Sequence, residues 1–572
     1  MTASYDLVIR GGTIVDGTGK KAFSGDVAVK DGKIAAVGKI DGKGQQEIDA
    51  AGRIVTPGFV DVHTHYDGHV TWTNRLYPSS MHGVTTVLMG NCGVGFAPCK
   101  PEDRQKLVYL MEGVEDIPEV VMTAGLPWNW ESFPDYLDRL DERQFDMDVA
   151  AQVPHAPLRV YVMGDRAVAK EPATPEDIAK MRKLAKEAIE AGALGFTTSR
   201  SLNHKATDGT VTPTYGSAGD ELAGIAGGLK EAGKGVLQLI SDWDDPEHEI
   251  GIVRRMLAES GRPLATTVIQ MHNNPDRWRD TLGRIEQASN EGFPIKAQVC
   301  GRPIGVFMGL GFARNPFMHA PAYKEIADLE PAARAAEMRK PERRTTILSQ
   351  VPGEMDWMEV VFLTKFENMY EFDESGYEPT ADMSVAARAA ATGVDPFAYA
   401  YDVISKGDGD VVLYVPGANF MGNQVDAPEE MITHKDTIWA LGDGGAHCSL
   451  ICDASLQTYY LERWAEQNGG PLPIERVIQG MTSDTARSIG LNDRGVIAPG
   501  YRADINVIDL AKSKVGRPEM IHDLPTGATR LHQGAGGYDA TIVAGEVTYR
   551  KGEPTGALPG RLVRGAQPEP VA

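Results

Sequence analysis

Both ends of the chain carry short runs in which apolar and polar residues alternate, separated by glycine turns. The runs YDLVIRGGTI (5–14) and DVAVKDGKIAAVG (26–38) are typical of antiparallel strands, and Asp31-Gly32 is placed as a tight hairpin turn would be. The segment YDATIVAGEV (538–547) repeats the pattern of residues 5–14. We predict that the two ends pair in one small sheet, against the alternative that two hairpins match by chance.

The middle of the chain alternates amphipathic helices with short apolar strands. In residues 174–192, Thr174 is placed to cap a helix, Pro175 lies in its first turn and Gly192 ends it. The apolar strand ALGFTTS (193–199) follows, and the same alternation recurs at 253–270 and 285–299. Repeated units of strand and helix predict a parallel sheet.

Residues 301–430 interrupt this alternation with long aromatic and acidic stretches such as FENMYEFDESGYEP (366–379). Long insertions in compact domains often cover binding sites, so we predict that this one forms part of a pocket roof. The alternative is a peripheral contact surface.

Composition narrows the class of protein. The 572 residues are 42% hydrophobic and 24% charged, as in a folded soluble protein, and the net charge of -22 disfavours nucleic acid and membrane surfaces as partners. Five cysteines are few and odd in number, which favours a reducing compartment over a disulfide scaffold. The first residues build no signal-peptide core and no apolar run reaches the ~18 residues of a membrane span, so we expect a cytoplasmic protein. The sequence leaves the oligomeric state open, and a homo-oligomer is one possibility.

The strongest chemical signal is TPGFVDVHTHYD (56–67). Side chains alternate between the faces of a strand, so Asp61, His63 and His65 point the same way. Two imidazoles at a strand end can bind one divalent ion such as zinc. The alternative is a pair of hydrogen-bonded structural histidines.

Two further candidates follow predicted strands. Cys92 lies among glycines after the apolar run GVTTVLM (83–89), where a thiolate could bind or bridge metals; a simply buried cysteine is the alternative. Asp443 stands in a glycine-flanked turn after TIWAL (437–441), where a carboxylate can hold water and take its proton; an ordinary turn aspartate is the alternative. His447 either lies beside Asp443 in the site or caps the helix that follows.

Other polar residues lie at predicted strand ends. They are His155, Arg159, Arg200 and His204. An arginine can bind a substrate carboxylate through two parallel hydrogen bonds, so Arg200 and His204 are candidate substrate-binding residues. A structural role is the alternative for each.

The order of these motifs, ending in MTSDTARSIGLNDRGVIAPGYRADINVID (481–509), resembles the amidohydrolase superfamily across nearly the whole chain. The segment MGNCG with Cys92 is similar to N-acyl-D-amino-acid deacylases, the D-aminoacylases. The resemblance implies a (β/α)8 barrel over 58–484, a β-sandwich built from 1–57 with 485–550, and a tail from 551 to 572. It also implies one or two divalent metals, with His63, His65, Cys92 and Asp443 as ligands.

The sequence departs from that family where strands 5 and 6 each supply a histidine. The segment GVLQLISDWDD (235–245) has none, and PLATTVIQMHNN (263–274) has only His272, past the expected position. Asp242, Gln270 or His272 could substitute. We predict one tightly held ion, with zinc favoured by the imidazole and thiolate donors, and two ions as the alternative.

These observations lead to a functional hypothesis. We expect a hydrolase that opens an amide in a small-molecule substrate, an N-acyl-D-amino acid by resemblance, with metal-activated water and Asp443 as the proton acceptor. Hydrolysis of a cyclic amide, dipeptide, carbamate or ester is the nearest alternative. A non-catalytic barrel that binds small molecules is the other.

Overall fold

The computed structural model describes residues 4–350, 355 and 357–571. Within them, eight parallel strands form one curled sheet in the order β16-β12-β11-β10-β9-β8-β7-β6. The strands are β6 (Phe59–Asp61), β7 (Val84–Met89), β8 (Asp148–Pro154), β9 (Gly195–Arg200), β10 (Val236–Ser241), β11 (Leu264–Thr267), β12 (Ile295–Val299) and β16 (Thr437–Trp439). A parallel bridge between Thr64 and Gly444 joins the first strand segment to the last and closes the barrel. The predicted (β/α)8 barrel is confirmed.

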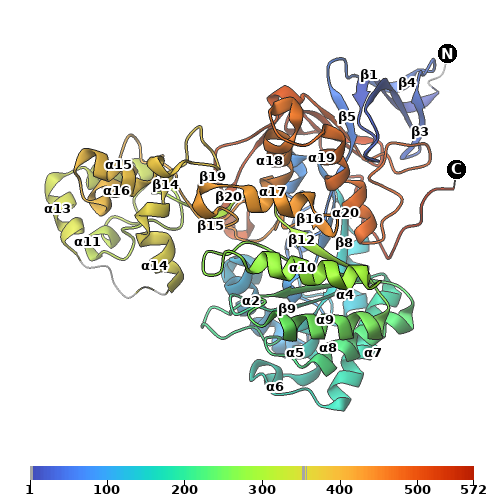
Figure 1. Ribbon diagram of the computed structural model, residues 1–572, viewed down its shortest axis with the longest axis horizontal. Helices are drawn as coiled ribbons and strands as arrows, with labels where there is room; N and C mark the ends of the chain where they lie inside the picture. The colour runs from blue at the N-terminus through green and yellow to red at the C-terminus, as the bar shows by residue number, and fades with distance from the viewer. Residues whose placement is uncertain (1–3, 351–354, 356, 572) are drawn as a thin grey trace.

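Helices cover the outside of the barrel, as the apolar faces of the sequence predict (Figure 1). The four on one side are α7 (Pro175–Ala191), α8 (Gly219–Ala232), α9 (Pro246–Ser260) and α10 (Arg277–Asn290). In α7, the Thr174 hydroxyl accepts from the Asp177 amide and the Asp177 carboxylate accepts from the Thr174 amide. Gly192 ends this helix in the left-handed conformation, which glycine adopts at little cost.

The two ends of the chain meet in one mostly antiparallel sheet, in which nine strands are formed by described residues. They are β1 (Tyr5–Ile14), β2 (Phe23–Lys30), β3 (Lys33–Gly38), β4 (Gly44–Asp49), β5 (Ile54–Pro57), β17 (Ile505–Ile508), β22 (Tyr538–Val543), β23 (Glu546–Arg550) and β24 (Glu553–Pro554). The N-terminal strand β5 pairs antiparallel with the C-terminal strand β17. This domain lies beside the barrel, near both chain ends (Figure 1). Beyond it, Gly560 pairs with Phe145 and Leu562 with Val149, so this part of the tail lies along the barrel.

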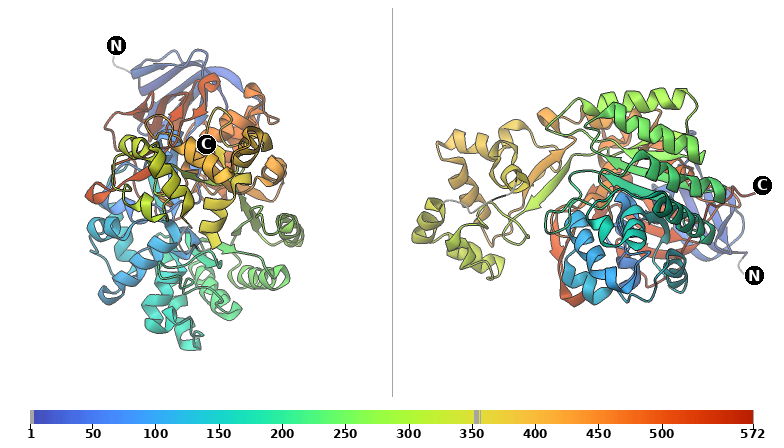
Figure 2. Two further views of the ribbon diagram at one scale, coloured as in Figure 1. Left: turned by 90° about the vertical axis from the view of Figure 1, so that its left-hand side faces the viewer. Right: turned by 90° about the horizontal axis from the view of Figure 1, so that it is seen from below.

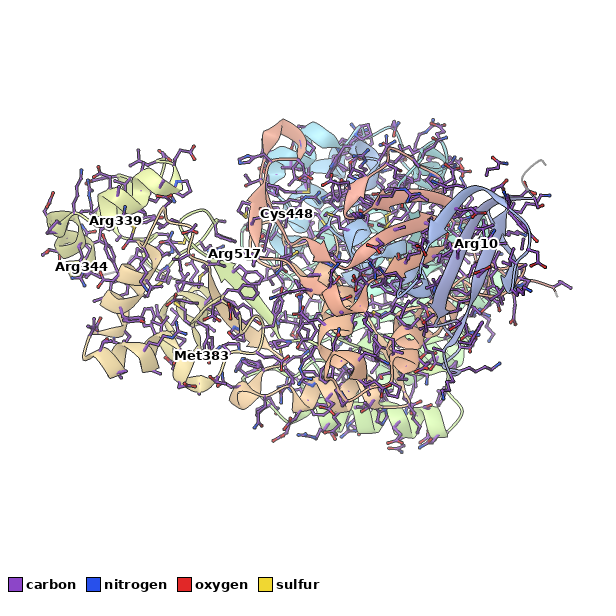
Figure 3. The ribbon with its side chains drawn as sticks, turned by 90° about the horizontal axis from the view of Figure 1, so that it is seen from above. Arg10, Arg339, Arg344, Met383, Cys448 and Arg517 are labelled. Carbon is purple, nitrogen blue, oxygen red and sulfur yellow. The ribbon has the colours of Figure 1, made fainter. Side chains whose placement is uncertain are left out.

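The chain leaves the barrel after β12 and builds a separate lobe, residues 304–418. Its strands β13 (Ile304–Met308), β14 (Tyr370–Glu371) and β15 (Leu413–Ala418) form a small sheet. Its helices are α11 (Pro321–Lys324), α12 (Pro331–Met338), α13 (Pro341–Ser349), α14 (Trp357–Thr364), α15 (Val385–Thr392) and α16 (Pro396–Ile404). The lobe has its own apolar core and extends away from the barrel (Figure 2). Figure 3 shows Arg339 and Arg344 at its far end and Arg10 at the opposite end of the molecule.

None of the helices in the described ranges is long and apolar enough to cross a membrane.

Candidate metal centre

The end of β6 brings two imidazoles into the barrel mouth. His63 and His65 follow β6 directly and are each 1% exposed. Asp61, the last residue of the strand, accepts a hydrogen bond from the His63 amide at 3.1 Å and another from the Gln457 side chain at 3.1 Å. A Cβ at position 442 would lie 1.9 Å from the Asp61 carboxylate, so Gly442 is required for this close approach. Asp61 therefore shapes the turn that carries both histidines.

The ring orientation of each histidine is set by a second buried residue. The Gln298 side-chain oxygen lies 2.8 Å from His63 Nδ1, and the Glu115 carboxylate lies 3.3 Å from His65 Nδ1. Because the Gln298 oxygen is an acceptor, the proton of the His63 ring is assigned to Nδ1 and the lone pair to Nε2, and an ionised Glu115 assigns the His65 ring in the same way. Burial lowers the pKa of both histidines, which keeps them neutral, the form that binds metals.

Two more donors face the Nε2 atoms. Cys92 Sγ lies 3.4 Å from the His63 Nε2 and 3.6 Å from the His65 Nε2. Asp443 Oδ1 lies 3.4 Å and 3.7 Å from the same two nitrogens. Ligands at the corners of a tetrahedral zinc site stand about 3.4–3.6 Å apart, given bonds of about 2.0–2.3 Å. The donor atoms of His63, His65 and Cys92 are thus close enough to share one ion, and Asp443 Oδ1 approaches both imidazoles of that set.

Loops with unusual backbone geometry place Cys92 and Asp443. Both residues have positive φ, 55° and 45°, which side chains other than glycine seldom adopt. The Asn91 side chain donates to the carbonyls of Thr64 and Leu88, tying the Cys92 loop to the β6 end. The Asp443 amide donates to the His63 carbonyl at 3.0 Å. The loops after the first, second and last strands are therefore locked together around the donors.

The centre is rich in buried acids. Burial raises the pKa of Asp443 to about 7 and that of Asp67 to about 7. Burial, and then repulsion by Asp443 and Asp67, raises the pKa of Glu115 well above its usual range. Burial and the same acids act likewise on the Cys92 thiol. A bound cation reverses this preference, because it stabilises the ionised forms.

An unpartnered atom marks the same place. Among the described residues, Asp443 Oδ1 is buried without a hydrogen bond of good geometry. Such atoms are costly unless a ligand, ion or water satisfies them. The donor set, its spacing and this atom all fit a divalent ion.

The three substitutes predicted for the missing histidines lie elsewhere. Asp242 accepts from the Ser201 hydroxyl at 2.6 Å and from the Leu202 amide at 2.7 Å. The Gln270 side chain donates to the Pro275 carbonyl at 3.3 Å, and the exposed His272 lies against the backbone of Pro416. Of the groups of three or more His, Cys, Asp and Glu donors within the described ranges, His63, His65 and Cys92 form the one close enough to share an ion.

Strands β10 and β11 do expose other polar atoms to the barrel interior. Gln238 and Thr266 are buried there, and the side-chain polar atoms of both lack a partner among the described residues. An amide and a hydroxyl are weak zinc ligands compared with imidazole and thiolate.

The predicted substrate-binding residues separate into two kinds. Arg200 is held by Glu249 through two hydrogen bonds, of 2.8 and 2.9 Å. His204 shares a hydrogen bond of 2.7 Å between its Nδ1 and the Ser199 hydroxyl. Burial, and then repulsion by His447 and His63, lowers the pKa of His204 to about 4.

His155 and Arg159 are structural. Both contact the Glu221 carboxylate, at 3.0 and 2.7 Å, inside the barrel wall.

Glu115 and Gln298 are absent from the residues that the sequence indicated. Glu115 ends helix α2 (Arg104–Glu115), where an acidic residue carries no special signal. Gln298 lies in the apolar strand β12, and a polar residue inside such a strand is a signal that could have found it.

Comparison with known proteins gives consistent results. The amidohydrolase family profile matches residues 46–549. A protein of Mycobacterium tuberculosis (strain ATCC 25618 / H37Rv), described as uncharacterized, is 28% identical over 96% of this chain and 93% of its own length. The D-aminoacylase of Alcaligenes xylosoxydans xylosoxydans is 31% identical over 50% of this chain and 55% of its own.

Two solved structures share the fold. The crystal structure of a D-aminoacylase has a TM-score of 0.65 and 22% identity, covering 98% of this chain and 100% of that one. The N-acyl-D-glutamate deacylase from Bordetella bronchiseptica, complexed with zinc and a phosphonate inhibitor, has a TM-score of 0.63 and 22% identity, covering 98% and 99%.

Proposed function

This chain belongs to the amidohydrolase family, and from that premise we propose that it hydrolyses the amide bond of N-acyl-D-amino acids or their derivatives with one bound divalent ion, zinc by preference. The observation that carries the proposal is the cluster of His63, His65 and Cys92 donor atoms, with Asp443 Oδ1 3.4 and 3.7 Å from the two imidazole nitrogens. The D-type substrate is suggested by the deacylases that the chain is similar to.

The metal supplies one part of the chemistry. When bound, a divalent ion polarises a substrate carbonyl and lowers the pKa of water from ~15.7 towards ~7. Gln298 and Glu115 hold the two imidazoles in the orientation and tautomer that binding requires. The burial of His63, His65 and Cys92 excludes bulk water and strengthens every electrostatic interaction in the centre.

Asp443 supplies the proton transfer. A group that accepts a proton from the attacking water and returns it to the leaving nitrogen works best with a pKa near the working pH. Burial raises the pKa of Asp443 to about 7, and Oδ1 faces the donor cluster without a hydrogen-bond partner among the described residues. Asp443 therefore has the position and the proton affinity of a general acid and base.

We propose that the lobe contributes to the roof of the pocket. Leu450 and Ile451, in the loop that carries Asp443, pack against the lobe core, and the Phe307 amide donates to the Leu450 carbonyl at 2.8 Å. Proteolytic nicking of the lobe should lower kcat/KM for the preferred substrate. An unchanged kcat/KM for every substrate would contradict this role.

The proposed reaction is tested by a panel of amides with zinc-loaded protein. The panel holds N-acyl-D- and N-acyl-L-amino acids with free and blocked carboxyls, lactams, dipeptides, carbamates and esters, and release of the amine or acid is measured. We expect turnover of N-acyl-D compounds, and its loss in Asp443→Ala. Turnover of lactams or esters alone would favour a different bond on the same scaffold, and no turnover with no zinc uptake would favour a non-catalytic barrel.

A further inference from the structure

We infer that Leu531, on a hairpin that the C-terminal part of the chain sends to the barrel mouth, sets the size of the amino acid that the enzyme releases. N-acyl derivatives of small D-amino acids, such as D-alanine, are then preferred over those of large ones. This inference rests on the proposed function and narrows its substrate class. It follows from the residues that surround the open side of Asp443.

The hairpin lies between two strands of the terminal sheet. After β17 the chain leaves that sheet and forms two antiparallel pairs before it returns to β22. The pairs are β18 (Lys514–Val515) with β21 (Ala535–Gly536), and β19 (Glu519–Ile521) with β20 (Arg530–His532). Figure 1 shows β19 and β20 between the lobe and the barrel, away from the terminal sheet. The C-terminal segment therefore contributes to the barrel mouth as well as to the sheet.

Hydrogen bonds hold the hairpin against the loop that carries Asp443. The Leu531 amide donates to the Cys448 carbonyl at 2.6 Å, and the Arg530 guanidinium donates to the Tyr77 carbonyl at 2.7 Å. Figure 3 labels Cys448 beside this C-terminal strand. The Leu531 side chain is therefore fixed next to the loop of the candidate base.

Gln533, which directly follows the hairpin, joins it to the lobe and the barrel. Its side-chain oxygen accepts hydrogen bonds from the Tyr377 hydroxyl of the lobe at 2.5 Å and from the Ser455 hydroxyl at 3.0 Å. Its backbone carbonyl lies 2.9 Å from His82 Nε2. Gln533 is fully buried, and a satisfied buried network of this kind makes its surroundings rigid. The hairpin is thus a firm wall.

The metal centre is open on the side of Asp443. The side chains of His63 and His65 are each 1% exposed, whereas that of Asp443 is 18% exposed. Asp443 lines a small cavity whose apolar walls include Pro78, Ile451 and Leu531. Its charged walls are Asp453 and Arg530, which are ion-paired with Arg302 and Asp523. A substrate that reaches the candidate base through this cavity passes Leu531.

The chemistry decides which part of the substrate lies in the cavity. In the proposed reaction Asp443 returns a proton to the leaving nitrogen, so that nitrogen must come within hydrogen-bonding distance of its carboxylate. The amino acid attached to the nitrogen then lies on the side of Asp443, against the cavity wall. The cavity has room for about one or two water-sized groups, which is enough for a methyl side chain but not for a branched one.

The experiment compares two substrates that differ in the side chain alone. N-acetyl-D-alanine and N-acetyl-D-leucine share the acyl group, the carboxylate and the configuration. With zinc-loaded protein, we expect kcat/KM for the alanine compound to exceed that for the leucine compound at least tenfold. Equal values, or a preference for leucine, would overturn the inference while leaving amide hydrolysis intact. Turnover of neither, nor of any other amide, would overturn the proposed function and this inference together.

A variant tests the wall itself. Leu531→Ala widens the cavity on the hairpin side, so kcat/KM for N-acetyl-D-leucine should rise at least fivefold relative to that for N-acetyl-D-alanine. Leu524→Ala is the matched control, since Leu524 is a leucine of the same segment and almost equally buried, at 5% exposed against 3%, but lies outside the cavity wall that the described residues form. The same rise in both variants, or in neither, would contradict the assignment to Leu531.

A second variant works in the opposite direction and leaves no void in the wall. Leu531→Phe narrows the cavity, so kcat/KM for N-acetyl-D-alanine should fall at least fivefold relative to that for N-acetylglycine, which has no side chain to place. Circular dichroism verifies the fold of each variant. A ratio of the two substrates that stays within twofold of the parent value would show that Leu531 does not set the size limit.

Discussion

The two sides of the barrel mouth differ in what their polar groups are free to bind. On one side, which we call the donor side, His63, His65, Cys92 and Asp443 follow β6, β7 and β16 and point their donor atoms at a common place. On the other, the paired side, Arg200 ends β9, and Asp242 and Gln270 follow β10 and β11; their side chains are bound by Glu249, Ser201 and the Pro275 carbonyl. A polar residue at a strand end is thus a candidate ligand only where no protein group already satisfies it.

The contrast explains why one ion is expected. The fifth and sixth strands lack the histidines that the resemblance led us to expect. Their unpartnered side chains, Gln238 and Thr266, are weak zinc ligands. A second ion there would find neither imidazole nor thiolate among the described residues that line β10 and β11, and would have to break buried ion pairs to gain carboxylates.

The largest effect should come from the base on the donor side. Asp443→Asn removes both the proton acceptor and a metal ligand. Loss of general acid–base catalysis alone lowers the rate by about 10²- to 10⁴-fold, so we expect kcat to fall at least ~10³-fold. Asp242→Asn is the control on the paired side and should change kcat less than threefold. Steady-state kinetics of both variants, with circular dichroism to verify folding, decide the point; comparable losses would erase the difference between the two sides.

The next effect concerns metal retention. Cys92→Ser replaces a soft thiolate by a hydroxyl, and zinc affinity should fall by about 100-fold because sulfur is the better zinc ligand. Cys300→Ser serves as control, since Cys300 is equally buried but its thiol contacts the Arg302 carbonyl. Competition with a zinc-binding dye measures both. If Cys92→Ser bound zinc as tightly as the parent, the thiol would only pack behind the site.

A smaller effect is expected from the residue that orients His65. Glu115→Gln keeps the size of the side chain but weakens the acceptor at Nδ1, and loss of such partners typically costs about 10–100-fold in metal affinity or activity. We expect a loss in that range, and partial retention in Glu115→Asp. Zinc affinity and kcat measured together would show whether both fall; no change in either would mean that the 3.3 Å contact has no functional weight.

Sequence patterns predicted the donor side better than the paired side. The His-x-His spacing, the glycines around Cys92 and Asp443, and the strand periodicity are local signals. They predicted a parallel sheet and candidate residues at its strand ends, and the family resemblance supplied the barrel and the ligand set. Glu115 and Gln298 reach the histidines from 50 and 235 positions away, a contact that no local pattern encodes. The pairing of Arg200 with Glu249, 49 positions apart, is hidden for the same reason.

The smallest expected effect concerns His82, which lies outside both sides of the barrel mouth and affects the stability of the protein but not its activity. His82 is buried between the Thr458 hydroxyl and the Gln533 carbonyl, and burial lowers its pKa to about 3. The unfolded chain takes up a proton as pH falls through about 6.5, whereas the folded chain does not until about 3, so stability present at pH 7 is lost below 6.5. The loss at pH 5 should be about 2 kcal/mol.

Urea unfolding at pH 7 and pH 5 measures this loss. His82→Gln removes the titration, so its free energy of unfolding should change less between the two pH values by that amount, while its zinc content stays that of the parent. An unchanged slope would mean that His82 does not stay neutral in the folded protein.

The number of metal ions per chain tests the central claim most directly. Protein loaded with excess zinc and dialysed gently is analysed for metal and for protein concentration. The donor side as described holds one ion, so we predict one equivalent of zinc per chain, falling well below one in Cys92→Ser after the same dialysis. Two equivalents in the parent protein would contradict the account, because the second ion would need ligands from β10 and β11, whose described residues offer neither imidazole nor thiolate.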